Sequence, residues 1–317
     1  MQRHPGLTRL TAVESAAHSR PQKVAGSAMN ERPEATPSAR PRRRLVLAAA
    51  GAAALGGGLW AWLRREADDG SLARVRAAGE LRVGYAVEAP YALIATDGSV
   101  SGESPEVART AATRLGLRTS WIKTPFERLL PELEARRFDL VAAGLFVNPK
   151  RAARVRFTRP TLRVRSAWLT LAGNPKGLSS YAALQRLDGV RVAALAGSVE
   201  HAALEELHLA PGRLVSVPDA QSGLAAVGSG AVDALALSLP TVRQMAAASG
   251  GRLDALPAQG SGVQDNLVAL AVHHDDATLQ AALDQVLADY VGSGAHRAML
   301  QRFGLAAEDL PQGVDVR

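Results

Sequence analysis

The chain has 317 residues, a formal net charge of +7 and no cysteine. This length is enough for two domains of ordinary size, and the lack of cysteine excludes disulfides, thiolate metal sites and a lipobox cysteine. The positive charge is concentrated at one end: residues 1–65 carry 11 Lys and Arg against 3 Asp and Glu, whereas residues 66–317 carry 26 against 27. A nearly neutral main part argues against a nucleic-acid-binding surface, so no nucleic-acid partner is expected.

The first 63 residues have the composition of an export segment. Residues 1–44 are rich in Arg, Pro, Ser and Ala and are predicted to be a disordered basic leader. Residues 45–63 then form an uncharged run of 19 residues, which is long enough to cross a bilayer. Arg42 and Arg43 in front of this run resemble a twin-arginine export signal, with a Sec signal as the other route.

Two fates of the apolar run stay open. Trp60 and Trp62, followed by basic residues, suit a membrane interface and slightly favour an uncleaved anchor. The alternative is cleavage at the Ala-x-Ala of residues 52–54. In both cases the basic leader stays inside, and residues 66–317 are expected to be periplasmic or extracytoplasmic. Residues 64–71 are interpreted as a polar linker.

Strands and helices alternate after the linker, which predicts βαβ units and a parallel sheet. A first half and a second half show the same order of elements. In the first half the predicted elements are a strand at 80–87, a helix at 104–116 with Ser104 as N-cap, a strand at 117–123, a helix at 126–137 and a strand at 138–145. In the second half they are a strand at 189–197, a helix at 198–207 capped by Ser198, a strand at 212–218, a helix at 219–230 capped by Asp219 and a strand at 231–238, followed by a long helix at 278–304.

Two extended, β-prone runs are interpreted as connectors between the halves, at residues 165–173 and 266–274. If both cross, the first lobe is discontinuous and comprises 72–167 plus 270–317, while the second lobe comprises 172–266. The predicted fold class is α/β, with two α/β lobes joined by two crossing strands. Two crossing strands make a hinge, and a ligand is expected in the cleft between the lobes.

Several stretches resemble the extracytoplasmic solute-binding proteins of ABC transporters, in the amino-acid-binding family (family 3). The most specific is "LLPELEARRFDLVAAGLFVNPKRAARVRFTRP", and "LRVGYAVEAPYA", "VRVAALAGSVE" and "LAAVGSGAVDALA" support it in the same order. Within that family, "EAPY", "GLFVNPKR" and "GSVE" are most similar to the ectoine and hydroxyectoine binders. The resemblance implies the α/β, periplasmic-binding-protein-like fold (type II). It also implies a non-enzymatic receptor without cofactor or metal that captures a small ligand by lobe closure, acts as a monomer and delivers to an ABC permease.

Arg151 is the first candidate for ligand binding. The resemblance implies that an Arg at this place grips a ligand carboxylate, which a guanidinium does in a planar, bidentate way. Asn148 and Pro149 are expected to shape the turn that aims it. The alternative is an ordinary surface Arg, since "KRAARVRFTR" holds five basic residues.

Three aromatic residues at ligand-loop positions, Tyr91, Phe126 and Phe146, are predicted to form a three-sided box. A ring face attracts delocalised cations, with about 0.5–2 kcal/mol for each desolvated contact. Phe146 stands where amino-acid binders commonly have a small hydroxyl residue. Core packing is the alternative explanation for each ring.

Glu88, Glu200 and Ser238 complete the candidate site. Glu88 follows the first strand, where open α/β sheets bind ligands, and Glu200 lies in the first turn of its helix, which helix electrostatics alone could explain. Two carboxylates facing an aromatic box suit the flat, cationic amidinium of ectoine, whose carboxylate is left for Arg151. Ser238 occupies the place where many amino-acid binders hold the ligand ammonium with an Asp, and it is a candidate for a hydrogen bond in the cleft.

Two other functions remain open. One is an amino-acid-binding protein with the same fold, which Arg151 permits and the missing Asp disfavours. The other is an enzyme, because a few proteins of this fold are dehydratases and Glu200 could act as a general acid or base. No paired carboxylates, Ser-His-Asp set or phosphate-binding loop in the sequence supports an enzyme, so no catalytic residue is assigned.

Overall fold

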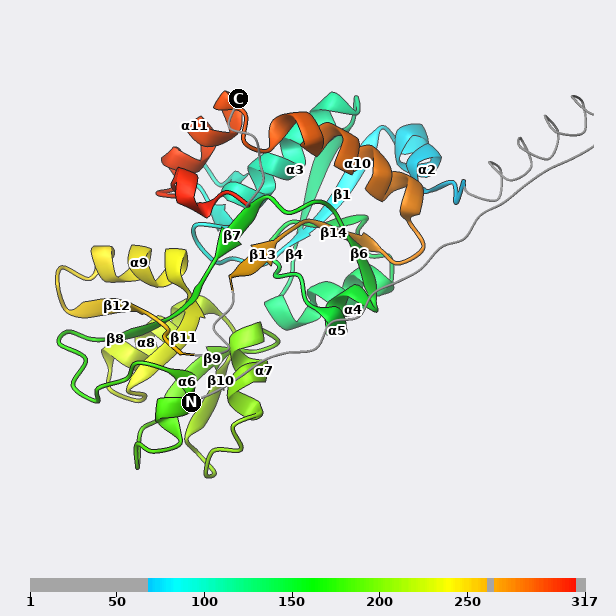
Figure 1. Ribbon diagram of the computed structural model, residues 1–317. Coiled ribbons are helices and arrows are strands. Elements are labelled where there is room, and N and C mark those ends of the chain that lie inside the picture. The colour runs from blue at the N-terminus through cyan, green and yellow to red at the C-terminus, as the bar shows by residue number, and fades with distance from the viewer. Residues whose placement is uncertain (1–67, 261–264, 312–317) are drawn as a thin grey trace, which may run out of the picture. The chain divides into compact units, whose positions relative to one another are not determined.

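The computed structural model describes residues 68–260 and 265–311, which form two α/β lobes joined by a pair of short strands (Figure 1). The predicted leader (1–44) and apolar segment (45–63) lie outside the described residues. Of the predicted linker, residues 68–70 belong to no helix or strand, and Ser71 already begins helix α2.

The first lobe is built on a five-stranded sheet of order β4-β1-β5-β14-β6. Strand β1 is parallel to β4 and β5, whereas β14 is antiparallel to β5 and β6. Helices α2, α3, α10 and α11 gather on one side of this sheet, and α4 and α5 lie at the other (Figure 1). The elements are α2 (Ser71–Ala78), β1 (Glu80–Tyr85), α3 (Glu103–Arg114), β4 (Arg118–Lys123), η1 (Phe126–Arg128), α4 (Leu129–Glu134), β5 (Leu140–Val141), α5 (Pro149–Ala152), β6 (Val155–Phe157), β14 (Ala271–His273), α10 (Ala277–Tyr290) and α11 (Gly294–Arg302).

The second lobe repeats this arrangement with a sheet of order β10-β9-β11-β8-β12. Strand β9 is parallel to β10 and β11, and β8 is antiparallel to β11 and β12. The elements are β8 (Ser166–Leu171), α6 (Tyr181–Leu184), β9 (Val192–Leu195), α7 (Val199–Glu205), β10 (Leu214–Val217), α8 (Ala220–Gly228), β11 (Ala234–Ser238), α9 (Leu239–Ala248) and β12 (Leu253–Pro257). As predicted, Ser198 caps α7 and Asp219 caps α8, each through its side-chain oxygen.

The hinge is an antiparallel pair of strands, β7 (Leu162–Val164) and β13 (Asn266–Val268). Each is followed by a strand that enters the sheet of the other lobe: β8 completes the second sheet and β14 completes the first. A small hairpin of β2 (Leu93–Ile94) and β3 (Val100–Ser101) and the short helix η2 (Ala307–Asp309) are the remaining elements of the described residues.

The predicted connector at 165–173 is therefore wrong in its position. Residues 166–171 form β8, a strand inside the second sheet with five of its six residues buried, so the second lobe begins before residue 172. The second predicted connector, 266–274, is divided in the same way between hinge strand β13 and sheet strand β14. A continuous apolar run is typical of a strand buried on both faces, and that explains why it belongs to a sheet.

Three predicted helices differ in detail. Ser104 is not the N-cap of α3, because the helix begins at Glu103 and the buried Ser104 hydroxyl accepts a hydrogen bond from the Gly144 N–H (3.0 Å). The predicted helix 126–137 is split into η1 and α4, and 278–304 is split into α10 and α11. The second split coincides with Gly292, whose φ of 80° belongs to the left-handed region that ends helices.

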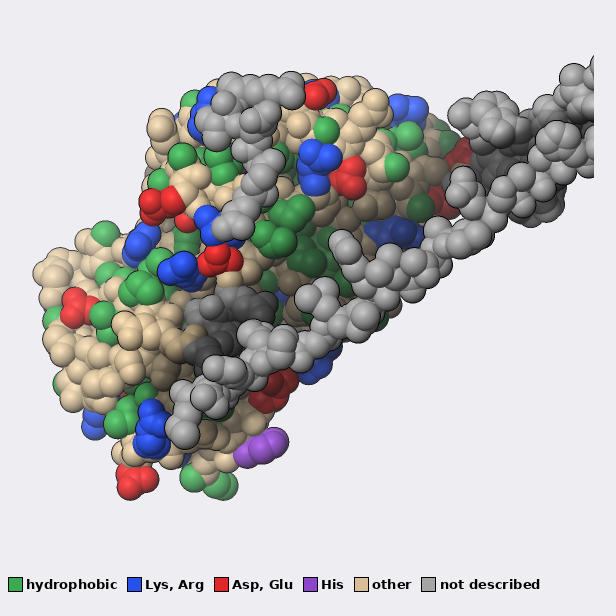
Figure 2. All heavy atoms as spheres, in the orientation of Figure 1, with side chains coloured by type: hydrophobic (Ala, Val, Ile, Leu, Met, Phe, Trp, Pro, Cys, Tyr) green, Lys and Arg blue, Asp and Glu red, His purple; other side chains and the backbone are tan. Residues whose placement is uncertain are grey.

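The surface agrees with the near-neutral charge of this part of the chain. On the face drawn in Figure 2, Lys and Arg are interspersed with Asp and Glu. Within residues 68–260 and 265–311, no helix has the length and apolar character needed to cross a membrane.

Gly84 in β1 provides a test of the packing in the first lobe. A Cβ atom at this position would lie 2.4 Å from the Phe138 ring, so Gly84→Ala overpacks the core. We expect it to lower the free energy of unfolding by about 1–3 kcal/mol, measured by urea denaturation. Gly228→Ala, where a Cβ meets no atom within 4 Å, is the control and should not destabilise the protein. Equal stability of both variants would contradict the packing described.

Candidate ligand-binding site

A cavity lies between the two lobes, where the parallel strands of both sheets have their carboxyl ends, as expected of open α/β sheets. In this structure the cavity is small: its volume of about 20 Å³ has room for about one water molecule. Loops after β1, β4 and β5 form the wall of the first lobe, and the loop after β9 and the end of β11 form the wall of the second. The lining residues are Glu88, Phe126, Gly144, Phe146, Arg151, Ser198, Val199, Glu200, Leu237 and Ser238. All predicted site residues except Tyr91 are among them.

Arg151 is positioned by a cap at the start of α5 and by two hydrogen bonds of its guanidinium. Asn148 caps α5 by accepting a hydrogen bond from the Arg151 N–H (2.8 Å), and Pro149 occupies the first helical turn, so both residues shape the turn as predicted. The Arg151 side chain is 8 % exposed. Its Nη1 donates to the Phe146 carbonyl in the first lobe (2.8 Å) and its Nη2 to the Gly197 carbonyl in the second (2.9 Å). Arg151 therefore joins the two lobes directly.

The charge of Arg151 persists at neutral pH. Burial lowers the pKa of its guanidinium to about 10, and the nearby Glu200 carboxylate opposes that shift. The structure shows hydrogen bonds from two of the five N–H groups that a guanidinium carries. The remaining donors are the chemical basis for an additional bond to a carboxylate.

The rings do not form the predicted three-sided box. Phe126 and Phe146 line the cavity, but the Phe126 ring already has the Arg151 guanidinium 5.7 Å from its centroid. Tyr91 lies behind the wall: it is 1 % exposed, and a Cβ atom at Gly144 would lie 2.4 Å from its Cγ. Its buried hydroxyl, next to Ser238, makes no hydrogen bond of good geometry. Of the three rings, Phe146 alone lines the cavity and has no cation of the described chain against its face.

The two predicted acids approach the cavity from opposite lobes. Glu88, from the first lobe, is 7 % exposed and accepts a hydrogen bond from Thr241 Oγ1 of the second lobe (2.8 Å). Burial raises the pKa of Glu88 to about 7, and the charge of Glu200 adds to this. Glu200 is 3 % exposed and accepts from Ser166 Oγ (2.8 Å); burial raises its pKa as well. With both acids ionised, these two carboxylates and Arg151 sum to one net negative charge.

Ser238 is the N-cap of α9, and its hydroxyl donates to Thr241 Oγ1 (2.9 Å), which in turn donates to Glu88. Gly144 also lines the cavity, and Thr241 and Ser166 bind the two acids, but none of these three residues was predicted from the sequence. The run "SLPT" at 238–241, a cap followed by Pro, marks the start of α9 and could have placed Thr241 beside Ser238. Nothing in the sequence could have paired Thr241 with a residue 153 positions away.

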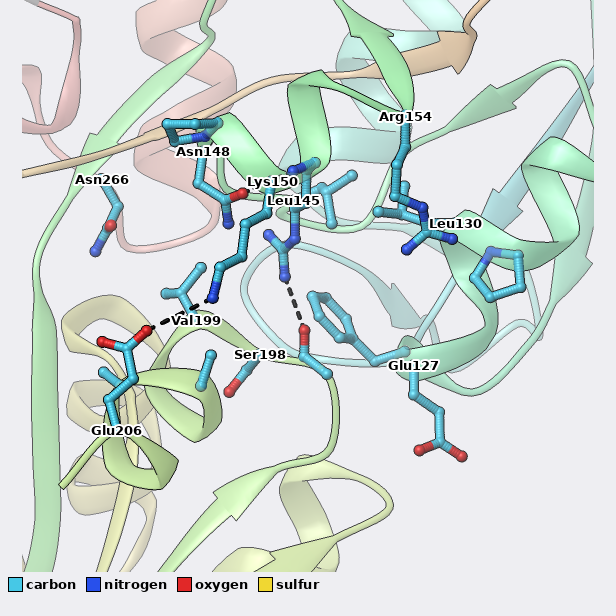
Figure 3. A pocket seen from close by; sticks show the side chains of 17 residues that line it. Glu127, Leu130, Leu145, Asn148, Lys150, Arg154, Ser198, Val199, Glu206 and Asn266 are labelled. Carbon is cyan, nitrogen blue, oxygen red and sulfur yellow. Dashed lines mark hydrogen bonds and ion pairs between the residues drawn. The ribbon is translucent and has the colours of Figure 1, made fainter. Parts of the chain in front are cut away.

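Two grooves lead away from the cavity. The wider one passes Arg151 and is crossed by Lys150 of α5 and Glu206 after α7, whose Nζ and Oε1 atoms are 3.5 Å apart (Figure 3). Both side chains are largely exposed, so this ion pair adds little stability. The second groove is lined by Lys123, Thr124 and Asp219 and meets the cavity at Glu88 and Phe126.

The fold and the cavity are those of a type II periplasmic-binding protein. Comparisons with known proteins lead to the same class. EhuB, solved in complex with hydroxyectoine, superposes with a TM-score of 0.71 at 29% identity, covering 76% of this chain and 94% of its own. A probable amino-acid ABC transporter periplasmic-binding protein of Sinorhizobium fredii is 26% identical over 76% of this chain and 82% of its own length. The lysine/arginine/ornithine-binding periplasmic protein of Escherichia coli is 23% identical over 68% and 83%.

The model of the bacterial extracellular solute-binding proteins, family 3, matches residues 81–306, and the chain belongs to this family. The resemblance and the fold class predicted from the sequence are thereby confirmed. The chain is a solute-binding protein of the amino-acid ABC transporter family, whose members bind small ligands and work with ABC permeases.

The raised pKa of Glu88 predicts a pH-dependent stability. Because the folded-state pKa of about 7 lies above the ordinary 4.5, the folded protein holds a proton that the unfolded chain releases. The cost of ionising Glu88 appears as the pH rises from about 4.5 to 7 and is complete above 7. Glu88→Gln should therefore raise the free energy of unfolding at pH 8 by about 2–3 kcal/mol and change it little at pH 4.5.

Chemical denaturation of the ligand-free protein at several pH values checks this prediction. Glu80→Gln, at the start of the strand that leads to Glu88, controls for the change in net charge. A stability difference between Glu88→Gln and wild type that is independent of pH would show that Glu88 ionises in the folded protein as it does in water.

Proposed function

We propose that this chain is the extracytoplasmic receptor of an ABC importer for a small zwitterionic compatible solute of the ectoine type. The observation that supports this most strongly is the convergence of Arg151, Phe146, Glu88 and Glu200 on one cavity between the lobes. Arg151 would bind the ligand carboxylate, while the ring and the two acids would receive a flat cation with N–H donors. The similarity to EhuB, which was solved with hydroxyectoine, points to the same ligand class.

The net charge of the cavity determines which protonation state suits a zwitterionic ligand. A zwitterion adds no net charge, so a neutral complex needs one of the two carboxylic acids to keep its proton. The raised pKa of Glu88 supports this arrangement, because burial already favours the protonated form of that acid. In this state Glu88 can also donate a hydrogen bond, whereas Glu200 faces the ligand cation as a carboxylate.

A second candidate is an amino acid with a cationic side chain. Such a ligand carries one net positive charge and would neutralise the cavity with both acids ionised, and a relative from Escherichia coli is named for lysine, arginine and ornithine. Against it, Ser238 stands where many amino-acid binders have an acid for the ligand ammonium, and its hydroxyl is engaged with Thr241. No histidine is among the residues that line the cavity in the described chain, and we propose no enzymatic role for Glu200.

The remaining parts of the proposal concern the setting. We propose that the leader and the apolar segment (residues 1–63) direct the protein out of the cytoplasm and that residues 45–63 hold it at the membrane if they are not cleaved. The receptor would act as a monomer and would deliver its ligand to a cognate permease after the lobes close around it.

Thermal shift measurements on the full-length chain test the ligand class. A ligand that binds only the folded state stabilises it by about 2.7 kcal/mol at 100 times its Kd, which corresponds to a rise in Tm of about 5–10 °C for a domain of this size. We expect this rise with ectoine or hydroxyectoine. A rise with L-arginine or L-lysine, and none with either ectoine, would favour the second candidate instead.

Arg151→Ala tests the carboxylate contact. Removing one partner of a buried charge pair should weaken binding of the ligand found above by about 2–5 kcal/mol, measured by isothermal titration calorimetry. Arg154→Ala is the matched control, because Arg154 lines the neighbouring groove and its salt bridge to Glu134 is partly exposed. Comparable affinities of both variants would remove Arg151 from the site.

A further inference from the structure

The two lobes touch at a glycine. Gly197 lies in the loop between β9 and α7 of the second lobe, and its φ of 77° belongs to the left-handed region. Opposite it stands η1 of the first lobe. A Cβ atom added to Gly197 would lie 3.0 Å from Glu127 Cα and 3.2 Å from Glu127 Cβ. The contact therefore involves the main chain of the first lobe, which cannot swing aside as the end of a flexible side chain can.

Both sides of this contact are tied to the cavity. The Gly197 carbonyl accepts the hydrogen bond from Arg151 Nη2, and the next residue, Ser198, lines the cavity. On the other side, Phe126 precedes Glu127 and carries the ring that faces the Arg151 guanidinium. Any increase in the separation between Gly197 and Glu127 would move Arg151 and Phe126 away from Ser198 and Glu200.

A left-handed backbone conformation alone does not distinguish Gly197 from other glycines of the second lobe. Gly212, in the loop before β10 of the same lobe, has a φ of 79°, but an added Cβ there meets nothing within 4 Å. Gly197 combines the same backbone requirement with a close approach from the other lobe.

We propose that Gly197 is a positioning residue for ligand binding: its missing side chain sets how closely the lobes approach and so completes the cavity. The inference rests on the proposed function in assuming a ligand bound between the lobes, but it does not depend on which ligand that is. A Cβ at Gly197 would hold the lobes apart, reduce the population of the closed form and raise the apparent Kd by the same factor.

The experiment compares Gly197→Ala with Gly212→Ala in the full-length chain. Spin labels on Lys150→Cys and Glu206→Cys report the distance between the lobes, and the lack of natural cysteines makes both labels unique. These two residues face each other across the wide groove (Figure 3). The probe is ectoine, and L-arginine is used if ectoine does not raise the Tm of the wild type. Calorimetry gives the Kd, and thermal denaturation of the ligand-free variants monitors folding.

In the wild type and in Gly212→Ala, the probe should shorten the distance between the two labels and narrow its distribution. In Gly197→Ala the distribution of label distances should stay broad when the probe is added, and the Kd should rise about tenfold or more. The Tm of the ligand-free variant should be close to that of Gly212→Ala. Binding of L-arginine alone would refute the ectoine proposal and leave the role of Gly197 to be decided by the same comparison. Wild-type closure and affinity in Gly197→Ala would overturn the inference, as would a probe that binds the wild type without shortening the distance between the labels.

Discussion

The balance of charge around Arg151 is the constraint on which the site depends. Its guanidinium is the single basic group among the residues that line the cavity in the described chain, and it shares that space with two buried carboxylic acids. The same side chain donates to carbonyl groups of both lobes. Loss of Arg151 would leave the acids without a compensating charge and remove a link between the lobes, so ligand affinity and lobe closure are coupled in one residue.

The site could be predicted where local sequence determines the geometry. An Asn cap followed by Pro fixes the turn that presents Arg151. Glu88 and Glu200 follow strands of the two sheets whose carboxyl ends face the same cavity. Tyr91 could not be placed in the same way, because the room for its ring behind Gly144 depends on packing between segments far apart in the chain. Thr241 and Ser166, which position the two acids, depend likewise on how separate segments meet.

The fold shows the same division between local and long-range information. Alternation of strands and helices predicted two α/β halves, and side-chain caps at Ser198 and Asp219 marked helix starts correctly. The apolar runs that include β8 and β14 were recognised as extended, but composition does not tell to which sheet such a strand belongs. That assignment depends on the hinge, whose strands β7 and β13 pair only after the whole second lobe has intervened.

The exchange of strands at the hinge has a consequence for how the protein folds as it is made. Strand β14 and helices α10 and α11 follow the second lobe in the chain, so a growing polypeptide exposes an unfinished first sheet throughout synthesis of the second lobe. The strands of the second sheet, β8 to β12, follow one another in the chain without interruption. The second lobe can therefore fold first on the ribosome, whereas the first lobe is completed only after the carboxyl-terminal segment has been made. Pairing of strands so far apart in the chain is also intrinsically slow.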